Sequence, residues 1–216
     1  MKQIALNFYQ FNHAVRTPLT GILGLAGLLE QEHLTPQQSR RIHGILQAGR
    51  EMLRFIEKLE AKKPTSSAQP CMKKVEKFKS NKKKTILLVE DHPIIQQVHT
   101  AMLSNLGFAV DVAASGKEAL EKFNSEHIAV LLDIGLPDQS GVAVAKSLRK
   151  IERHFANQCI PIIAVTAQAD EELTEACLQA GMNACLAKPV TQDELGKVIH
   201  YWLRTTAKQC EVMEEK

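Results

Sequence analysis

Apolar residues follow two different patterns along the chain, and the change of pattern divides it in two. In the first part they recur every seven positions, in paired rows that begin with Phe8, Val15, Ile22 and Leu29 and with Phe11, Pro18 and Leu25. Such rows predict a helix that packs against other helices. From residue 85 onward, short apolar runs alternate with amphipathic segments. That alternation predicts strands and helices in turn.

The first part predicts a helical hairpin. A break at residues 32–36 supplies Thr35 as N-cap and Pro36 as the first residue of a second helix. The second helix repeats the seven-residue spacing, with rows of Ile42, Gly49 and Ile56 and of Ile45, Met52 and Leu59. Two helices cannot enclose a core by themselves. We therefore expect residues 1–61 to form an antiparallel hairpin that pairs with a second copy as a dimeric four-helix bundle.

The second part, residues 85–206, predicts an α/β domain. Its apolar runs place strands at 86–89, 108–112, 128–133, 160–166 and 184–186. Its amphipathic segments place helices at 93–106, 116–123, 142–153, 170–180 and 192–203, with Gly107 and Gly181 as stops. Five such units favour a parallel sheet with helices on both faces. The absence of a sixth unit suits a flavodoxin-like (βα)5 fold with strand order 2-1-3-4-5.

Chemically active side chains follow several of these strands. Asp133 ends the third strand, and a lone Asp in that place more often caps a turn. Other polar residues follow neighbouring strands, which favours a chemical role for Asp133 over a capping role. Glu90 and Asp91 end the first strand, Thr166 ends the fourth, and Lys188 follows the fifth. The carboxyl ends of parallel strands share one edge, where ligands bind. Three carboxylates there need a cation, for which Mg²⁺ is suited. The Thr166 hydroxyl and the Lys188 ammonium can donate hydrogen bonds to phosphoryl oxygens. The residues at this edge therefore predict phosphoryl transfer onto a carboxylate.

Four strings carry a resemblance for the whole of residues 85–206: Val89-Glu90-Asp91, Asp133 to Pro137 with Gly141, Val165-Thr166-Ala167, and Ala187-Lys188-Pro189. In this order they resemble the receiver domain of two-component response regulators, and overall the receiver of a hybrid histidine kinase. The resemblance implies that Asp133 accepts the phosphoryl group, assisted by Thr166 and Lys188. It implies that Glu90, Asp91, Asp133 and the Gly135 carbonyl hold Mg²⁺, and that Lys188–Pro189 is cis. One departure is Cys185, where many receivers have a Tyr or Phe that moves inward on activation.

A second resemblance lies in the first helix. An exposed helical His is ordinarily a solvated surface residue, but His13 stands within a string, residues 11–22, that resembles the phosphoacceptor box of histidine-kinase dimerisation domains. The resemblance implies that His13 is the phosphorylatable imidazole. It also implies that Thr17, one turn on and expected on the same outward face, helps place water for dephosphorylation. Ala14 departs from the family, which has an acidic residue there as the base for attack on ATP.

Composition and the remaining segments limit the class of protein to which the chain can belong. The net charge of +3 is mild, no apolar run reaches membrane-span length, and the N-terminus has no signal-peptide pattern. An odd number of scattered cysteines favours reduced thiols in the cytoplasm over disulfides or a zinc site. Residues 62–84 predict a flexible Lys-rich linker, and the alternative role for this basic run is contact with nucleic acid. Residues 207–216 predict an acidic tail. There is no P-loop, and the linker is too short for the ATP-binding domain of a histidine kinase.

Together these features predict a cytoplasmic phosphorelay protein that dimerises through residues 1–61. Mg²⁺-dependent phosphoryl transfer would connect Asp133 with His13 or with the histidine of a partner kinase. Expected partners are a histidine kinase, a response regulator or a phosphotransfer protein. Phosphotransfer and discharge of phospho-aspartate to water are expected, but ATP-dependent kinase activity from this chain alone is not. The alternative is a non-catalytic dimerising adaptor or decoy that docks on a histidine kinase or response regulator.

Overall fold

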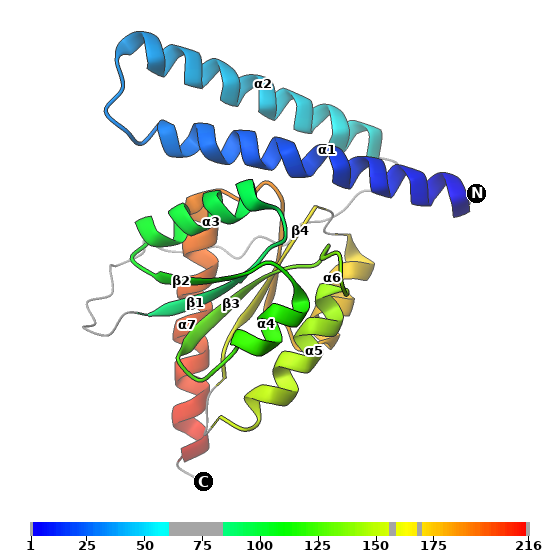
Figure 1. Cartoon of the computed structure of the whole chain (residues 1–216), viewed down its shortest axis with the longest axis vertical. Coiled ribbons are helices and arrows are strands. Elements are labelled where there is room, and N and C mark those ends of the chain that lie inside the picture. The colour runs from blue at the N-terminus through cyan, green and yellow to red at the C-terminus, as the bar shows by residue number, and fades with distance from the viewer. Residues whose placement is uncertain (1, 61–83, 156–158, 168–169, 215–216) are drawn as a thin grey trace.

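The computed structural model describes residues 2–60, 84–155, 159–167 and 170–214, with side chains described at 14–54, 56, 84–155, 159–167 and 170–206. A helical hairpin lies across one end of an α/β domain (Figure 1). All of the predicted linker except Lys84 lies outside the described residues. Among the described helices, none combines the length and apolar character needed to cross a membrane.

The hairpin consists of α1 (Lys2–Leu29) and α2 (Pro36–Glu60). The hydroxyl of Thr35 accepts a bond from the Gln38 amide at 3.3 Å, which confirms the predicted N-cap. The core between the helices is made by Leu19, Leu23 and Ala26 with Ile42, Leu46, Leu53 and Ile56. Much of the predicted seven-residue rows lies outside this core, because Ile22, Leu25, Leu29, Ile45 and Met52 are exposed. Within one chain these residues line an outer face of the hairpin rather than the contact between its helices.

The sheet has five parallel strands in the order β2-β1-β3-β4-β5, which confirms the predicted fold class. The strands are β1 (Thr85–Val89), β2 (Ala109–Ala113), β3 (His127–Asp133), β4 (Ile162–Thr166) and β5 (Ala184–Ala187). The central strands β1, β3 and β4 are almost wholly buried. A sheet covered on both faces explains why these strands are continuous apolar runs rather than alternating ones.

Helices cover both faces of the sheet. They are α3 (Pro93–Asn105), α4 (Gly116–Lys122), α5 (Gly141–Glu152), α6 (Glu171–Gln179) and α7 (Gln192–Glu214). One core cluster joins the strands to α3 and α7, and the other joins them to α4, α5 and α6. Gly107 and Gly181, which follow α3 and α6, have φ of +91° and +87°, as expected of glycines that end helices. The last helix runs to Glu214 instead of ending at Leu203 as predicted, so most of the predicted tail is helical.

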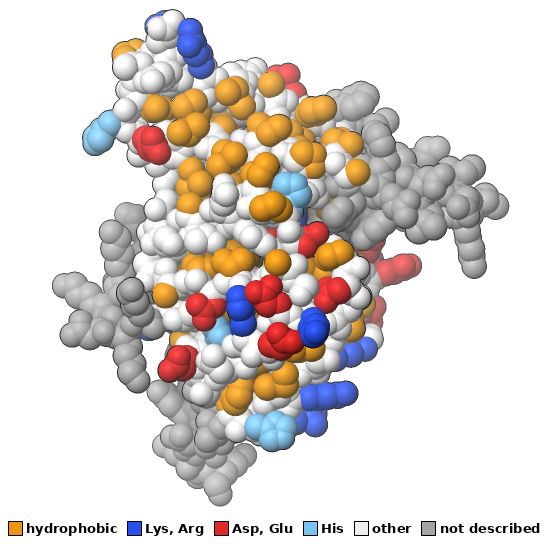
Figure 2. All heavy atoms as spheres, in the orientation of Figure 1, with side chains coloured by type: hydrophobic (Ala, Val, Ile, Leu, Met, Phe, Trp, Pro, Cys, Tyr) orange, Lys and Arg blue, Asp and Glu red, His pale blue; other side chains and the backbone are white. Residues whose placement is uncertain are grey.

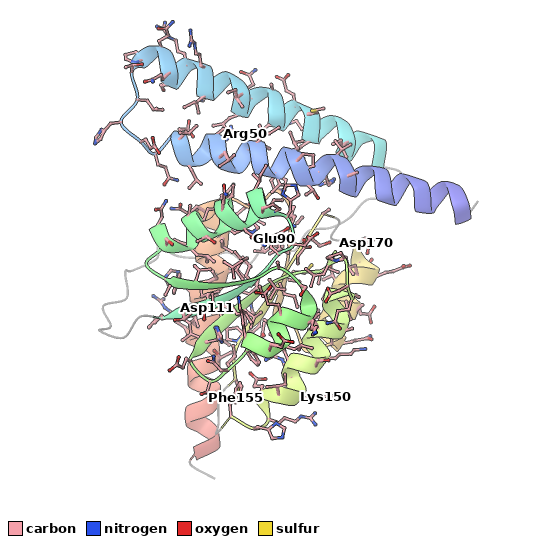
Figure 3. The ribbon with its side chains drawn as sticks, viewed as in Figure 1. Arg50, Glu90, Asp111, Lys150, Phe155 and Asp170 are labelled. Atoms are coloured by element: carbon pink, nitrogen blue, oxygen red, sulfur yellow. The ribbon has the colours of Figure 1, made fainter. Side chains whose placement is uncertain are left out.

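Strand register brings the predicted site residues to one edge. Asp133 pairs with Val165, and Thr166 pairs with Ala187, the residue before Lys188. Figure 3 shows Glu90 on the side of the sheet that faces the hairpin, whereas Lys150 and Phe155 lie at the far end of the domain. The hairpin and the chemically active strand ends therefore lie on the same side of the molecule.

Candidate functional site

Three carboxylates meet at this edge of the sheet. Each of Glu90, Asp91 and Asp133 offers an oxygen within 4.8 Å of the others. Glu90 and Asp133 are buried, with 1% and 3% of their surface exposed, whereas Asp91 is exposed. Carboxylate oxygens at this spacing have the chemistry that a hard divalent cation requires. The acidic cluster predicted from the strand ends is thus present, with one side open to solvent.

Lys188 joins two of these carboxylates. Its Nζ lies 2.7 Å from Glu90 Oε2 and 2.7 Å from Asp133 Oδ2, and the residue is 1% exposed. Its backbone N–H donates to the Thr166 carbonyl at 2.7 Å, which anchors the lysine beside the end of β4. The Lys188–Pro189 peptide bond is cis, as predicted. A buried ammonium directed at Asp133 is well placed to contact a group attached to that carboxylate.

Burial sets the protonation of this cluster. Burial raises the pKa of Glu90 to about 7, although the charge of Lys188 opposes the shift; the charge of Asp133 adds to it. For Lys188, burial favours loss of the proton, but Asp133 and Glu90 outweigh it, so its pKa is raised and the ammonium is retained. The cluster therefore holds a buried positive charge on Lys188 beside a Glu90 carboxyl whose pKa lies near neutral pH.

The loop after Asp133 is fixed by hydrogen bonds and a close backbone approach. The Gly135 amide donates to Asp133 Oδ1 at 3.0 Å. A Cβ at Gly141 would lie 2.4 Å from the Asp133 carbonyl oxygen, so a larger residue there would displace the loop. Further along, Asp138 accepts bonds from the Gly116 and Lys117 amides, both at 3.0 Å, and so ties the loop to the start of α4. These contacts hold Asp133 in place.

Two predicted residues of this edge have less direct support. Thr166 is buried at the end of β4, next to Asp133 in the neighbouring strand, and its contact with a phosphoryl group stays a prediction. Gly135 is exposed in the loop, and a metal-binding role for its carbonyl also stays a prediction. Cys185 is partly buried in β5 with its pKa raised to about 12 by burial, so its thiol is protonated at neutral pH.

In the hairpin, the two predicted site residues are His13 and Thr17. His13 lies within α1, and its side chain is outside the described residues. Thr17 is only partly exposed and its hydroxyl oxygen is buried, so the expected outward position is wrong. The reason is that Thr17 shares a helix face with Gly21 and Gly24, which lie against α3.

Sequence reasoning missed two buried residues near Lys188. Arg16, 6% exposed, donates from Nη1 to the Lys188 carbonyl at 3.3 Å. His99 of α3 is 1% exposed; burial lowers its pKa to about 4, and the charge of Lys188 adds to the shift. Arg16 stands inside the string that resembles the phosphoacceptor box, but its partner is 172 residues away. His99 looks like any core residue of an amphipathic helix, so neither neighbour could be inferred from spacing.

Comparison with known families matches both parts of the chain. Residues 86–200 match the response regulator receiver domain, and residues 9–66 match the His Kinase A (phospho-acceptor) domain. An ATP-binding domain was not found alongside them. The receiver match covers more than half of the chain.

Relatives and solved structures agree with these matches. The sensor histidine kinase RcsC of Escherichia coli is 34% identical over 115 residues, which are 53% of this chain but 12% of RcsC. The sensor protein EvgS of the same species is 36% identical over 114 residues, 52% of this chain and 9% of EvgS. This chain thus corresponds to a small part of each relative.

Among structures, a CheY-like receiver domain protein from Methanospirillum hungatei has a TM-score of 0.54 at 30% identity, covering 59% of this chain and 99% of that one. A co-crystal structure of the Saccharomyces cerevisiae histidine phosphotransfer protein Ypd1 with the receiver domain of Ssk1 gives a TM-score of 0.52 at 29% identity, covering 56% of this chain and 88% of that one. The chain therefore belongs to the response regulator receiver domain family, and its N-terminal hairpin carries the phospho-acceptor domain of histidine kinases.

Proposed function

We propose that this chain is a cytoplasmic phosphotransfer protein of two-component signalling, in which Asp133 exchanges a phosphoryl group with a histidine in a Mg²⁺-dependent step. The single observation that carries the proposal is the buried Lys188 ammonium held 2.7 Å from Asp133 Oδ2 within a cluster of three carboxylates. Both family matches support it, as do the names of the relatives, a sensor histidine kinase and a sensor protein.

Each residue has a defined role in this proposal. Glu90, Asp91, Asp133 and the Gly135 carbonyl would hold Mg²⁺, which when bound supplies positive charge against the carboxylates and the phosphoryl oxygens. An Asp133 carboxylate oxygen attacks phosphorus, and the bond from phosphorus to the donor breaks. The Lys188 ammonium and the Thr166 hydroxyl donate hydrogen bonds to the transferring group.

The histidine is that of His13 or of a partner histidine kinase or phosphotransfer protein. Thr17 would help water discharge phospho-aspartate. Because Ala14 replaces the acidic residue of the phosphoacceptor box, we propose phosphotransfer without autonomous ATP-dependent kinase activity.

The hairpin would make the protein a homodimer. Hydrophobic side chains are spread along the hairpin in Figure 2, above a band of acidic and basic side chains over the receiver. The exposed apolar residues of α1 and α2 include Ile22 at 51% and Met52 at 54% exposure. A second copy that covers them would complete a four-helix core.

Labelling with radioactive acetyl phosphate tests the proposal. Wild type and His13→Gln should take up base-labile label in the presence of Mg²⁺, whereas Asp133→Asn should take up none and EDTA should abolish uptake. Asp111→Asn, an acidic residue of β2 outside the cluster, serves as a matched control and should label like wild type. A wild-type protein that takes up no label would refute the proposal and favour the non-catalytic adaptor.

A further inference from the structure

Two cysteines of the receiver are in contact between α6 and β5. Cys177 lies in α6 and Cys185 lies in β5, eight positions later in the chain. Their thiols share a hydrogen bond, and the Cys185 thiol also forms a hydrogen bond with Thr174, one turn before Cys177 in α6. Cys185 packs against the same core cluster that contains Cys177. The fold thus brings together two thiols that no short sequence motif connects.

The two thiols differ in their access to solvent. Cys177 is completely buried, with 0% of its surface exposed, whereas Cys185 is partly exposed. Both are free cysteines, as is Cys159, which is exposed elsewhere in the receiver. A reagent from solution can therefore meet Cys185 first, while Cys177 lies behind it within reach of its sulfur. This is the arrangement of an attacking thiol and a resolving thiol.

The surroundings keep the pair protonated at neutral pH. Burial raises the pKa of Cys185 to about 12, and negative charge on Cys177 and Asp170 adds to the shift. Burial also raises the pKa of Cys177. Because the thiolate is the form that attacks an oxidant, the first step is slow under mild conditions. The second step needs no encounter, since the partner sulfur is already in contact.

We propose that Cys177 and Cys185 form a disulfide under attack by a hydroperoxide, and that this bond joins α6 to β5. The Cys185 sulfur attacks one peroxide oxygen, the O–O bond breaks, and the other oxygen leaves as water with the thiol proton. The Cys177 sulfur then attacks the Cys185 sulfur, the S–O bond breaks, and a second water leaves. Two thiols thereby lose two electrons and two protons, and one hydrogen peroxide is reduced to two waters.

The proposed bond would restrain the strand that leads to Lys188. Cys185 pairs with Ala164 of β4, and two residues later Ala187 pairs with Thr166. The Lys188 amide then donates to the Thr166 carbonyl. A covalent link from α6 to Cys185 therefore holds β5 a few residues before the lysine of the acidic cluster. A thiol reductant would release it, so the restraint depends on the redox conditions.

Mass spectrometry of the full chain tests the proposal. The other three cysteines are removed as Cys71→Ser, Cys159→Ser and Cys210→Ser, and the protein is treated with hydrogen peroxide and then alkylated. The expected product is a monomer that has lost two hydrogens, takes up no alkyl group and yields a linked peptide. Its rate of formation should rise roughly tenfold per pH unit from about pH 7 to about pH 9. A rate independent of pH would overturn attack by the Cys185 thiolate.

Two controls separate this pair from other thiols. Cys177→Ala, in a chain that keeps Cys159 and Cys185, should give no internally linked monomer. Cys185→Ala, at the partly exposed position, should give none either. A covalent dimer as the main product, or no linked monomer with the pair intact, would overturn the proposal.

Urea denaturation shows whether the bond suits the folded receiver. A disulfide between groups already in contact constrains the unfolded chain more than the folded one, so the midpoint should rise after oxidation. It should return to its original value on reduction with dithiothreitol. A lower midpoint after oxidation would mean that the bond forms only in unfolded molecules, and would overturn the proposal.

Discussion

Lys188 Nζ and Asp133 Oδ2 lie 2.7 Å apart, and both side chains are almost completely buried. The same ammonium also contacts Glu90, so one lysine compensates two buried acidic groups. A buried charge that loses its partner is costly, since it has neither water nor a counterion. The lysine is therefore as important to the stability of the receiver as to its proposed chemistry.

Lys188→Met should lower the free energy of unfolding by about 3–5 kcal/mol, because Glu90 and Asp133 lose their shared cation. Urea denaturation followed by circular dichroism measures the change. The control is Lys122→Met, which removes a half-exposed ion pair with Glu118 and should cost under about 1 kcal/mol. Equal losses in the two variants would contradict the compensating role of Lys188.

His99 should make the folded state sensitive to acid. Its pKa is lowered from 6.5 to about 4 by burial, with Lys188 adding to the shift and Asp133 opposing it. The unfolded chain therefore binds more protons between these values, so stability is complete above pH 6.5 and falls as the pH drops toward 4. At pH 5 the loss is about 2 kcal/mol. His99→Gln should remove this part of the decline between pH 7.5 and pH 5, as measured by urea denaturation, and an unchanged decline would show that His99 is not its source.

Gly107→Ala and Gly27→Ala should change stability in opposite directions. Gly107 has φ of +91° and nothing within 4 Å of its Cβ position, so alanine there costs about 1 kcal/mol through backbone conformation alone. Gly27 lies inside α1 with equally open surroundings, where alanine favours the helix by about 1 kcal/mol. Urea denaturation of both variants checks the signs, and a stabilising Gly107→Ala would contradict the left-handed conformation.

The exposed face of the hairpin should control self-association. Replacing Ile22 and Met52 together by glutamate buries charge in the proposed dimer core, and should weaken dimerisation roughly hundredfold or more. Sedimentation velocity at several concentrations measures it. Leu178→Glu, at an equally exposed apolar residue of α6, should leave the dimer unchanged. A monomeric wild type would remove the basis for this prediction.

Most of the fold could be predicted because it depends on local signals. Apolar runs that end in Glu90, Asp133 or Thr166 identify buried strands, and the strand ends place those residues at one edge. The position of the hairpin on the receiver could not be predicted. The seven-residue spacing identifies rows of apolar residues, but Thr17, Gly21 and Gly24 are not apolar and stand out in no such row. Their burial depends on the side chains of α3, which belongs to a distant part of the chain. The same limitation hid Arg16 and His99, whose neighbours come from distant parts of the chain.

Along α1, separate rows of residues face α2, α3 and open solvent. The proposed pairing of two hairpins through the exposed row would therefore not compete with the contact between α1 and either receiver. An assembled pair would be a central bundle flanked by two receivers, each retained on its own helix. Its two aspartates could then be charged independently, and loss of one receiver would leave the opposite half intact.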